Sequence, residues 1–123
     1  MSVYYYLKMK KPRPKKLNSV TFEIPTGYYK KDLYLTISED SNGTPFEVFA
    51  FIGKSGQQVT ADAEAVGRMV SLCLRCNIPV EAIIKELIDI DGGRTTNWDG
   101  KLIKSIPDAI GQVLKERYLN DRT

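Results

Sequence analysis

Two cysteines and the absence of histidine set the first limits on the chemistry of this chain. Cys73 and Cys76 form a C-x-x-C pair, a spacing found in zinc sites and in dithiol enzymes. A zinc site needs two further ligands, and the sequence has no histidine and no third cysteine. The pair is also expected near the C-terminal end of a helix, where a thiolate is disfavoured. We therefore expect Cys73 to be a core residue and expect no metal site.

Acid–base catalysis has no evident pair of residues. Histidine, the commonest general base, is absent. Four acidic residues flank expected turns and helix ends, where solvation or capping explains them: Glu39, Asp40, Asp89 and Asp91. We expect no catalytic residue, no cofactor and no enzymatic activity.

A short run, Gly53-Lys54-Ser55, resembles the end of a phosphate-binding P-loop. That loop requires another glycine five positions before Gly53, and this sequence has Val48 there, so a nucleoside triphosphatase is not expected. A helix that begins after Gly53 would still direct free N–H groups and the positive end of its dipole at an anion. Lys54 and Ser55 are therefore candidate ligand-binding residues.

The segment 92–100 carries a second group of candidates. Trp98 could stack on a base and Arg94 could form a two-pronged contact with a phosphate, while the polar residues between them could contact a ribose or base edge. The alternative is an ordinary loop between helices, held by a half-buried tryptophan. The next helix opens with its own N-terminal signature, which completes the candidate set: Arg94, Thr95, Thr96, Asn97, Trp98, Ser105 and Asp108.

The elements that would position these residues indicate an α+β fold, an antiparallel β-meander followed by about three α-helices. Strands are expected over residues 19–24, 33–38 and 45–52, with a tight hairpin at Asn42-Gly43 between the last two. In the second strand Leu33, Leu35 and Ile37 alternate with polar or mixed positions, which gives the strand one buried face.

Helical spacing of apolar residues follows the strands. Ser55 and Gln58 form a capping-box pattern for a helix that reaches about residue 77. Pro79 suits the start of a second helix, which Gly92-Gly93 would end. The last helix follows Ser105 and should bury one side, made of Ile106, Ala109, Ile110, Val113 and Leu114.

The charge of the chain is concentrated near its beginning. Residues 8–16 hold six basic residues and no acid; the remaining 12 basic and 15 acidic residues give a net charge of −3, so we do not expect nucleic acid as a partner. We expect residues 1–17 to form a β-prone edge or partner-binding strand and an extended basic arm. Residues 18–123 should form a single domain. Because the arm has no evident place in one core, it is expected to reach a neighbouring copy in a homo-oligomer.

The cellular setting follows from composition. No apolar run is long enough to span a bilayer, and no signal-peptide pattern is present. Two cysteines are too few for the disulfide framework of a small secreted domain. We expect a cytoplasmic protein with no membrane partner.

Five blocks of the sequence resemble the TSCPD domain, over roughly residues 18–118. That domain occurs at the C-terminus of adenosylcobalamin-dependent ribonucleotide reductases and also as a free-standing protein. The blocks are LYLTISED (33–40), NGTPFEVFAFIGKSG (42–56), AEAVGRMVSLCLR (63–75), IPVEAIIKEL (78–87) and SIPDAIGQVL (105–114).

Departures from the family pattern limit what the resemblance implies. The name-giving Thr-Ser-Cys-Pro-Asp is here residues 104–108, with Ile106 in place of the cysteine. The cysteine that many members carry after a glycine is also missing, because Tyr28 follows Gly27. These 123 residues leave no room for the reductase barrel, so we do not expect them to reduce ribonucleotides alone.

The resemblance leaves three functions open. The first is a non-catalytic module, expected to be a homo-oligomer, that binds a nucleotide-like ligand. The second is an accessory subunit that docks on a separately encoded ribonucleotide reductase. The third is a phage-type protein that sequesters a nucleotide or cyclic-nucleotide immune signal, which needs binding and no turnover.

Overall fold

The computed structural model describes residues 2–28, 31–53 and 57–119 and confirms the α+β class, with a three-stranded antiparallel sheet followed by helices. No helix within those residues is long and apolar enough to cross a membrane. The elements in chain order are α1 (Val3–Met9), β1 (Asn18–Pro25), β2 (Asp32–Glu39), β3 (Pro45–Ile52), α2 (Gln58–Arg75), α3 (Val80–Leu87), β4 (Thr96–Trp98), β5 (Lys101–Ile103) and α4 (Ile106–Tyr118).

The main sheet has the order β1-β2-β3, so β2 is central and both neighbours are antiparallel to it. The alternation predicted for the second strand is confirmed, because Leu33, Leu35 and Ile37 are fully buried. Their cross-strand partners in β3 are Ile52, Ala50 and Val48, which share the same inner face.

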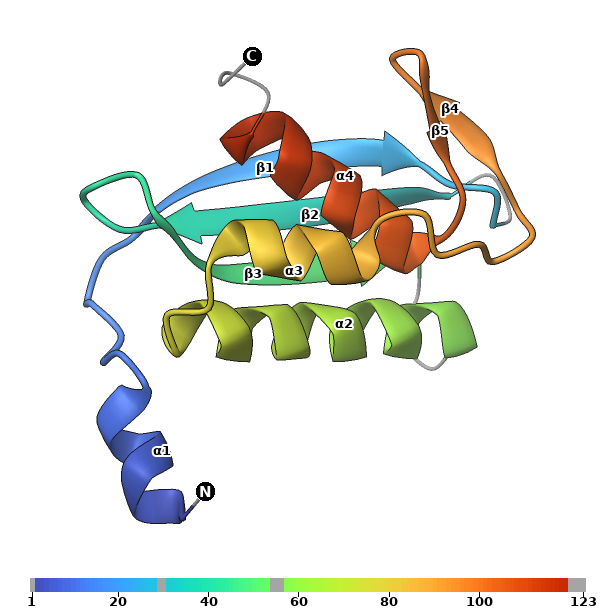
Figure 1. The fold of residues 1–123 in the computed structure, drawn as a ribbon. Helices are drawn as coiled ribbons and strands as arrows, with labels where there is room; N and C mark the ends of the chain where they lie inside the picture. The colour runs from blue at the N-terminus through green and yellow to red at the C-terminus, as the bar shows by residue number, and fades with distance from the viewer. Residues whose placement is uncertain (1, 29–30, 54–56, 120–123) are drawn as a thin grey trace.

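Three helices cover that inner face, as Figure 1 shows with α3 and α4 in front of the sheet and α2 beside β3. The predicted buried side of the last helix is confirmed: Ile106, Ala109, Ile110, Val113 and Leu114 all belong to the hydrophobic core. Cys73 also packs against this core, as its place on the apolar stripe of α2 predicts.

Helix α2 closes the free edge of β3. The Ser71 hydroxyl donates to the carbonyl of Val48 (3.0 Å) and accepts from the Val48 N–H (2.9 Å), so it takes the place of a neighbouring strand. The Thr60 hydroxyl donates to the carbonyl of Ile52 at 2.5 Å. An edge strand with exposed N–H and C=O groups would otherwise invite pairing with another chain.

The C-terminal end of α4 is tied to the sheet by Glu39 at the end of β2. Its carboxylate accepts two hydrogen bonds from Arg117, at 2.6 and 3.0 Å, and one from the Tyr118 hydroxyl. The Arg117 guanidinium lowers the pKa of Glu39, which stabilises the ionised carboxylate in the folded chain.

The expected N-terminal strand is wrong, because residues 3–9 form the helix α1. Ser2 caps it by accepting a hydrogen bond from the Tyr5 N–H. The helix pairs its own backbone groups, whereas a lone strand at this distance from the sheet would leave them without partners (Figure 1).

Two turns also differ from the expectations. The β2–β3 hairpin forms, but only Gly43 has a positive φ (76°), so a longer loop replaces the tight Asn42-Gly43 turn. Helix α3 ends at Leu87 and not at Gly92, because Asp89 takes a positive φ of 67° directly after it.

Segment 92–100, expected to be a loop, contains half of a second, two-stranded sheet. Strands β4 and β5 pair through Trp98 and Lys101, and the two residues between them, Asp99 and Gly100, have φ values of 49° and 85°. Positive φ at both positions is typical of a type I′ turn, whose twist matches that of paired strands.

Candidate functional site

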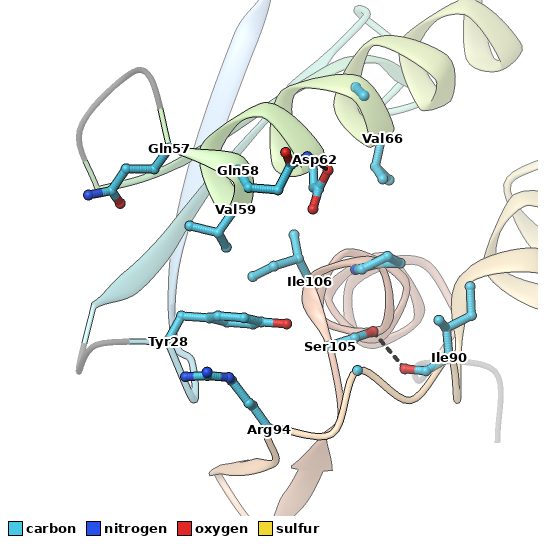
Figure 2. A pocket seen from close by; sticks show the side chains of 13 residues that line it. Tyr28, Gln57, Gln58, Val59, Asp62, Val66, Ile90, Arg94, Ser105 and Ile106 are labelled. Carbon is cyan, nitrogen blue, oxygen red and sulfur yellow. Dashed lines mark hydrogen bonds between the residues drawn. The ribbon is translucent and has the colours of Figure 1, made fainter.

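A pocket of about 790 Å³ lies between the first turns of α2 and α4 (Figure 2). Ligand pockets in proteins commonly measure about 300 to 1,000 Å³, so this one could hold a molecule the size of a nucleotide. The lining combines apolar side chains with a few polar ones: Tyr28, Gln57, Gln58, Val59, Asp62, Ala65, Val66, Ile90, Gly92, Arg94, Ser105, Ile106 and Pro107.

The α2 wall presents a helix N-terminus with no side-chain cap. Gln57 occupies the N-cap position, and its side chain makes no capping hydrogen bond. The first N–H groups of a helix have no partner within the helix, and they carry the positive end of its dipole. Gln58 donates to the Asp62 carboxylate at 2.8 Å, which places an amide and a carboxylate one turn further along the same wall.

The α4 wall is closed by its own residues. The Ser105 hydroxyl accepts a hydrogen bond from the Asp108 N–H (3.1 Å) and donates one to the Ile90 carbonyl (2.6 Å). Pro107 has no N–H to offer. The predicted N-terminal signature at Ser105 is confirmed, but it leaves little for an anion to bind, and Ile106 extends an apolar side chain into the pocket.

Asp108 has a structural role and is not among the lining residues. Its side chain is fully buried, and its two oxygens accept hydrogen bonds from the backbone N–H groups of Asp89 (2.7 Å) and Lys104 (2.8 Å). Gln112 donates a third, at 3.2 Å. The carboxylate therefore fixes both ends of the connection between α3 and α4, and this is the physical reason that α3 ends before Gly92.

Arg94 and Tyr28 form the floor of the pocket. The guanidinium carbon of Arg94 lies 5.2 Å from the centre of the Tyr28 ring, and Figure 2 shows the two groups stacked. Tyr28 is held in turn by a hydrogen bond from its N–H to the Thr26 hydroxyl at 3.1 Å. Gly27 packs so closely against the Arg94 backbone that a Cβ atom there would lie 2.8 Å from the Arg94 carbonyl oxygen.

A second cation lies near the start of α2. A Cβ atom built on Gly53 would lie 3.2 Å from the Lys31 ammonium and 3.5 Å from the side-chain oxygen of Gln57. The ammonium is therefore close to the residue that opens the helix. Lys31 beside the start of α2 and Arg94 on the floor of the pocket both favour an anionic ligand, as does the helix dipole.

The structure divides the residues predicted from the sequence. Arg94 and Ser105 line the pocket, whereas Thr95, Thr96, Asn97 and Trp98 do not. Lys54 and Ser55 lie outside the described residues, although the helix expected to open at Ser55 has its N-cap at Gln57.

The expectation that Trp98 stands beside Arg94 as a base platform is wrong. Trp98 lies on the hairpin and meets Phe22 edge to face, with ring centres 6.5 Å apart. The Lys101 ammonium lies 5.3 Å from the centre of its ring. Asn97 is also engaged in the hairpin, because its side-chain oxygen accepts the Gly100 N–H at 3.0 Å. The alternative interpretation of Trp98, an anchor that packs the segment onto the sheet, accounts for these contacts.

Four residues near the pocket escaped the sequence analysis: Tyr28, Lys31, Gln57 and Gln58. Gln57 and Gln58 directly follow the Gly53-Lys54-Ser55 run, in which the P-loop pattern indicated only Lys54 and Ser55 as candidates. Gly27 beside an aromatic residue in a strand connection was the available signal for Tyr28, since glycine in such a place allows a close approach of two backbones. Nothing in the sequence pairs Tyr28 with Arg94, which is 66 positions away.

The comparisons with known proteins give one match. A family model described as TSCPD domain matches residues 5–118, which is nearly the whole chain. No curated protein and no solved structure matches.

Proposed function

The chain belongs to the TSCPD domain family, a domain of ribonucleotide reductases, and we propose that it is a non-catalytic module that binds a nucleotide-like ligand in the pocket between α2 and α4. The observation that carries the proposal is the N-terminus of α2, where Gln57 makes no side-chain capping hydrogen bond and lines the same pocket as Arg94. A family tied to nucleotide chemistry makes a phosphate-bearing ligand the natural candidate.

The pocket complements the separate parts of a nucleotide. A phosphate would accept hydrogen bonds from the first N–H groups of α2 and from Arg94, with Lys31 close by. A base would lie against the apolar side of the pocket, which Val59, Val66 and Ile106 provide. Gln57 and Gln58 offer amide groups to a sugar or a base edge.

The lining residues favour binding over turnover. Asp62 is the one carboxylate among the described residues that line the pocket, and it accepts a hydrogen bond from Gln58. Acid–base catalysis on a nucleotide would need a second titratable group with a matched pKa beside it. The remaining polar groups are amides, hydroxyls and a guanidinium, which bind and orient a ligand.

Isothermal calorimetry tests the proposal with a panel of nucleoside mono-, di- and triphosphates and cyclic nucleotides. Arg94→Ala should weaken binding of the best ligand by about 1.5 to 3 kcal/mol, the range for hydrogen bonds to a charged group. Arg68→Ala is the matched control, because Arg68 lies on the exposed side of α2 and pairs with Glu64. Chromatography of the ligand after incubation should return it unchanged.

Trp98→Ala sharpens the test. The sequence predicted a loss of about 1 to 3 kcal/mol in affinity if a base stacks on this ring. The structure places Trp98 against Phe22, so we expect the variant to lose stability and to keep its affinity. The proposal fails if no nucleotide binds at about 1 mM, a binding free energy near −4 kcal/mol, or if Arg94→Ala binds as well as the parent.

The family supports a second candidate function, an accessory subunit that docks on a separately encoded ribonucleotide reductase. The observation in its favour is the family match itself. Co-purification of the chain with a reductase in the absence of nucleotide would favour docking over ligand binding.

A further inference from the structure

The outer face of the sheet, opposite the helices, is a small grid of three cross-strand rows. The row at one end joins Glu23, Tyr34 and Phe51, and the middle row joins Thr21, Thr36 and Phe49. The third row consists of Ser19, Ser38 and Glu47. We call these nine residues the outer face.

Aromatic side chains on the outer face are exposed. Phe49 is 58% exposed, Phe51 is 55% exposed and Tyr34 is 43% exposed, and Phe49 borders a hollow that it shares with Glu64 and Arg68 of α2. Adjacent aromatic residues exposed on one sheet face mark an interaction surface more often than isolated exposed residues do.

The charge beside these aromatic residues is acidic. Glu23 is the cross-strand neighbour of Tyr34, and Asp32 lies close enough to form a hydrogen bond with the Glu23 carboxyl and raise its pKa. A raised pKa is what two carboxyl groups produce when they share one site, so this end of the face attracts a cation.

Helix α1 has complementary chemistry and is not packed on its own chain. None of its residues is buried, and Val3, Tyr4, Tyr5 and Leu7 are each more than 60% exposed. Lys8 lies in its last turn, whereas the next two lysines face their own chain: Lys10 lines a hollow beside Glu47, and the Lys11 ammonium lies 5.4 Å from the centre of the Phe46 ring. A helix of seven residues is marginal in water by itself, so α1 needs a surface to pack against.

Two anchors hold α1 away from the body of its own chain. The Lys11 N–H donates to the Arg75 carbonyl at 2.8 Å, and the Arg75 guanidinium donates to the Lys11 carbonyl at 3.0 Å. Arg13 then forms a two-pronged pair with Glu47, at 3.1 and 3.0 Å, in the third row of the outer face. Figure 1 shows α1 projecting from this point beyond the end of α2.

We propose that two copies of the chain exchange these helices, with α1 of each copy packed on the aromatic part of the outer face of the other. Tyrosines would pack on Phe49, Phe51 and Tyr34, and Lys8 in the last turn of α1 would lie near Glu23 and Asp32. The exchange is reciprocal, which gives a closed dimer with twofold symmetry.

A second exposed apolar surface has different chemistry. The groove between α2 and α3, about 450 Å³, is lined almost wholly by aliphatic and sulfur-containing side chains, and its one charged residue is Glu86. It offers neither the aromatic rings nor the paired acids that suit a helix of tyrosines with a lysine in its last turn. Met69, 60% exposed in this groove, therefore provides a matched control position.

Light scattering during size-exclusion chromatography of the full chain tests the exchange. The parent should have twice the 13.9 kDa of a single chain. The double variant Phe49→Glu with Phe51→Glu should be monomeric, and so should a variant that lacks residues 1–10 but keeps Lys11 and Arg13. Met69→Glu should remain dimeric, and circular dichroism should show that all variants are folded.

Mixing separates an exchange from other dimers. The double glutamate variant keeps α1, and the truncated variant keeps the outer face, so an equimolar mixture should form a heterodimer in native mass spectrometry. A dimer of two outer faces would survive the truncation, and a dimer of two α1 helices would survive the glutamates. Either survival overturns the proposal, as does a monomeric parent or dissociation by Met69→Glu alone.

Discussion

Helices α2 and α4 begin on opposite walls of one pocket, yet their first turns differ in what remains open to a ligand. The α4 turn is capped by Ser105, contains Pro107 and has the buried Asp108 carboxylate. The α2 turn has the uncapped Gln57. Both helices have a capping pattern in the sequence, but only the one at Ser105 forms as a side-chain cap, and the helix expected to open at Ser55 has its N-cap at Gln57 without one.

The variant with the largest expected effect on stability is Asp108→Ala. The change leaves the buried N–H groups of Asp89 and Lys104 without an acceptor, so it should lower the free energy of unfolding by about 2 to 5 kcal/mol. Asp62→Ala on the exposed first turns of α2 should stay within about 0.5 kcal/mol of the parent. Denaturant unfolding measures both, and equal losses would contradict the contrast between the two walls.

Ser105→Ala probes the α4 cap more gently. Loss of the bonds to the Asp108 N–H and the Ile90 carbonyl should cost about 0.5 to 2 kcal/mol of stability. Because Ser105 also lines the pocket, its effect on nucleotide affinity decides between two roles. An unchanged affinity in calorimetry fits a structural cap, whereas a loss as large as that of Arg94→Ala would make the hydroxyl a ligand contact.

The far end of α4 gives a prediction about pH. The folded-state pKa of Glu39 is lowered by Arg117, so its stabilisation is present above the unfolded pKa, about 4.3, and is lost as the pH falls through the folded value. Glu39→Gln should cost about 1 kcal/mol at neutral pH. In acid the parent and the variant should converge, and a difference that persists below both pKa values would refute this account.

The smallest expected effect is at the α2 N-cap. Gln57→Asp supplies a capping carboxylate and should stabilise the fold by about 0.5 to 1 kcal/mol. The same carboxylate repels an anion at that terminus, so affinity for a phosphate ligand should fall. Gln57→Ser adds a neutral cap and serves as the control. If Gln57→Asp leaves affinity unchanged, the phosphate does not lie at α2.

Regular patterns made much of the fold predictable. The three main strands were placed from the alternation of residues such as Leu33, Leu35 and Ile37, because one buried face imposes a period of two. The last helix was placed from its apolar side and from the cap at Ser105. Both signals are local in the sequence, and the tertiary structure keeps the strands and the helix that they predict.

The errors arose where local composition and tertiary contacts disagree. The β-prone residues 3–7 form a helix, since helical bonding satisfies a backbone that has no neighbouring strand. Residues 96–103 are too polar to indicate strands by alternation, although Asp99-Gly100 is a recognised hairpin signal.

The candidate site was only partly predictable for the same reason. Arg94 was identified by its chemistry, but its neighbour in space, Tyr28, is brought to it by a strand connection far away in the chain. The side chain of Trp98 is equally suited to binding a ligand, but it packs on Phe22 instead. Residue type suggests which side chains could bind a ligand, and only the assembled fold decides which of them share a pocket.

The hydroxyl of Ser71 has a consequence for how the chain emerges during synthesis. The strand edge that Ser71 closes, at Val48, lies only 23 residues earlier in the chain. The ribosome therefore synthesises α2 soon after β3. Residues 45–75 can therefore form a hairpin-like unit of strand and helix before α3 and α4 exist. A nascent sheet edge that is sealed by the next segment to leave the exit tunnel has little time to recruit a neighbouring nascent chain.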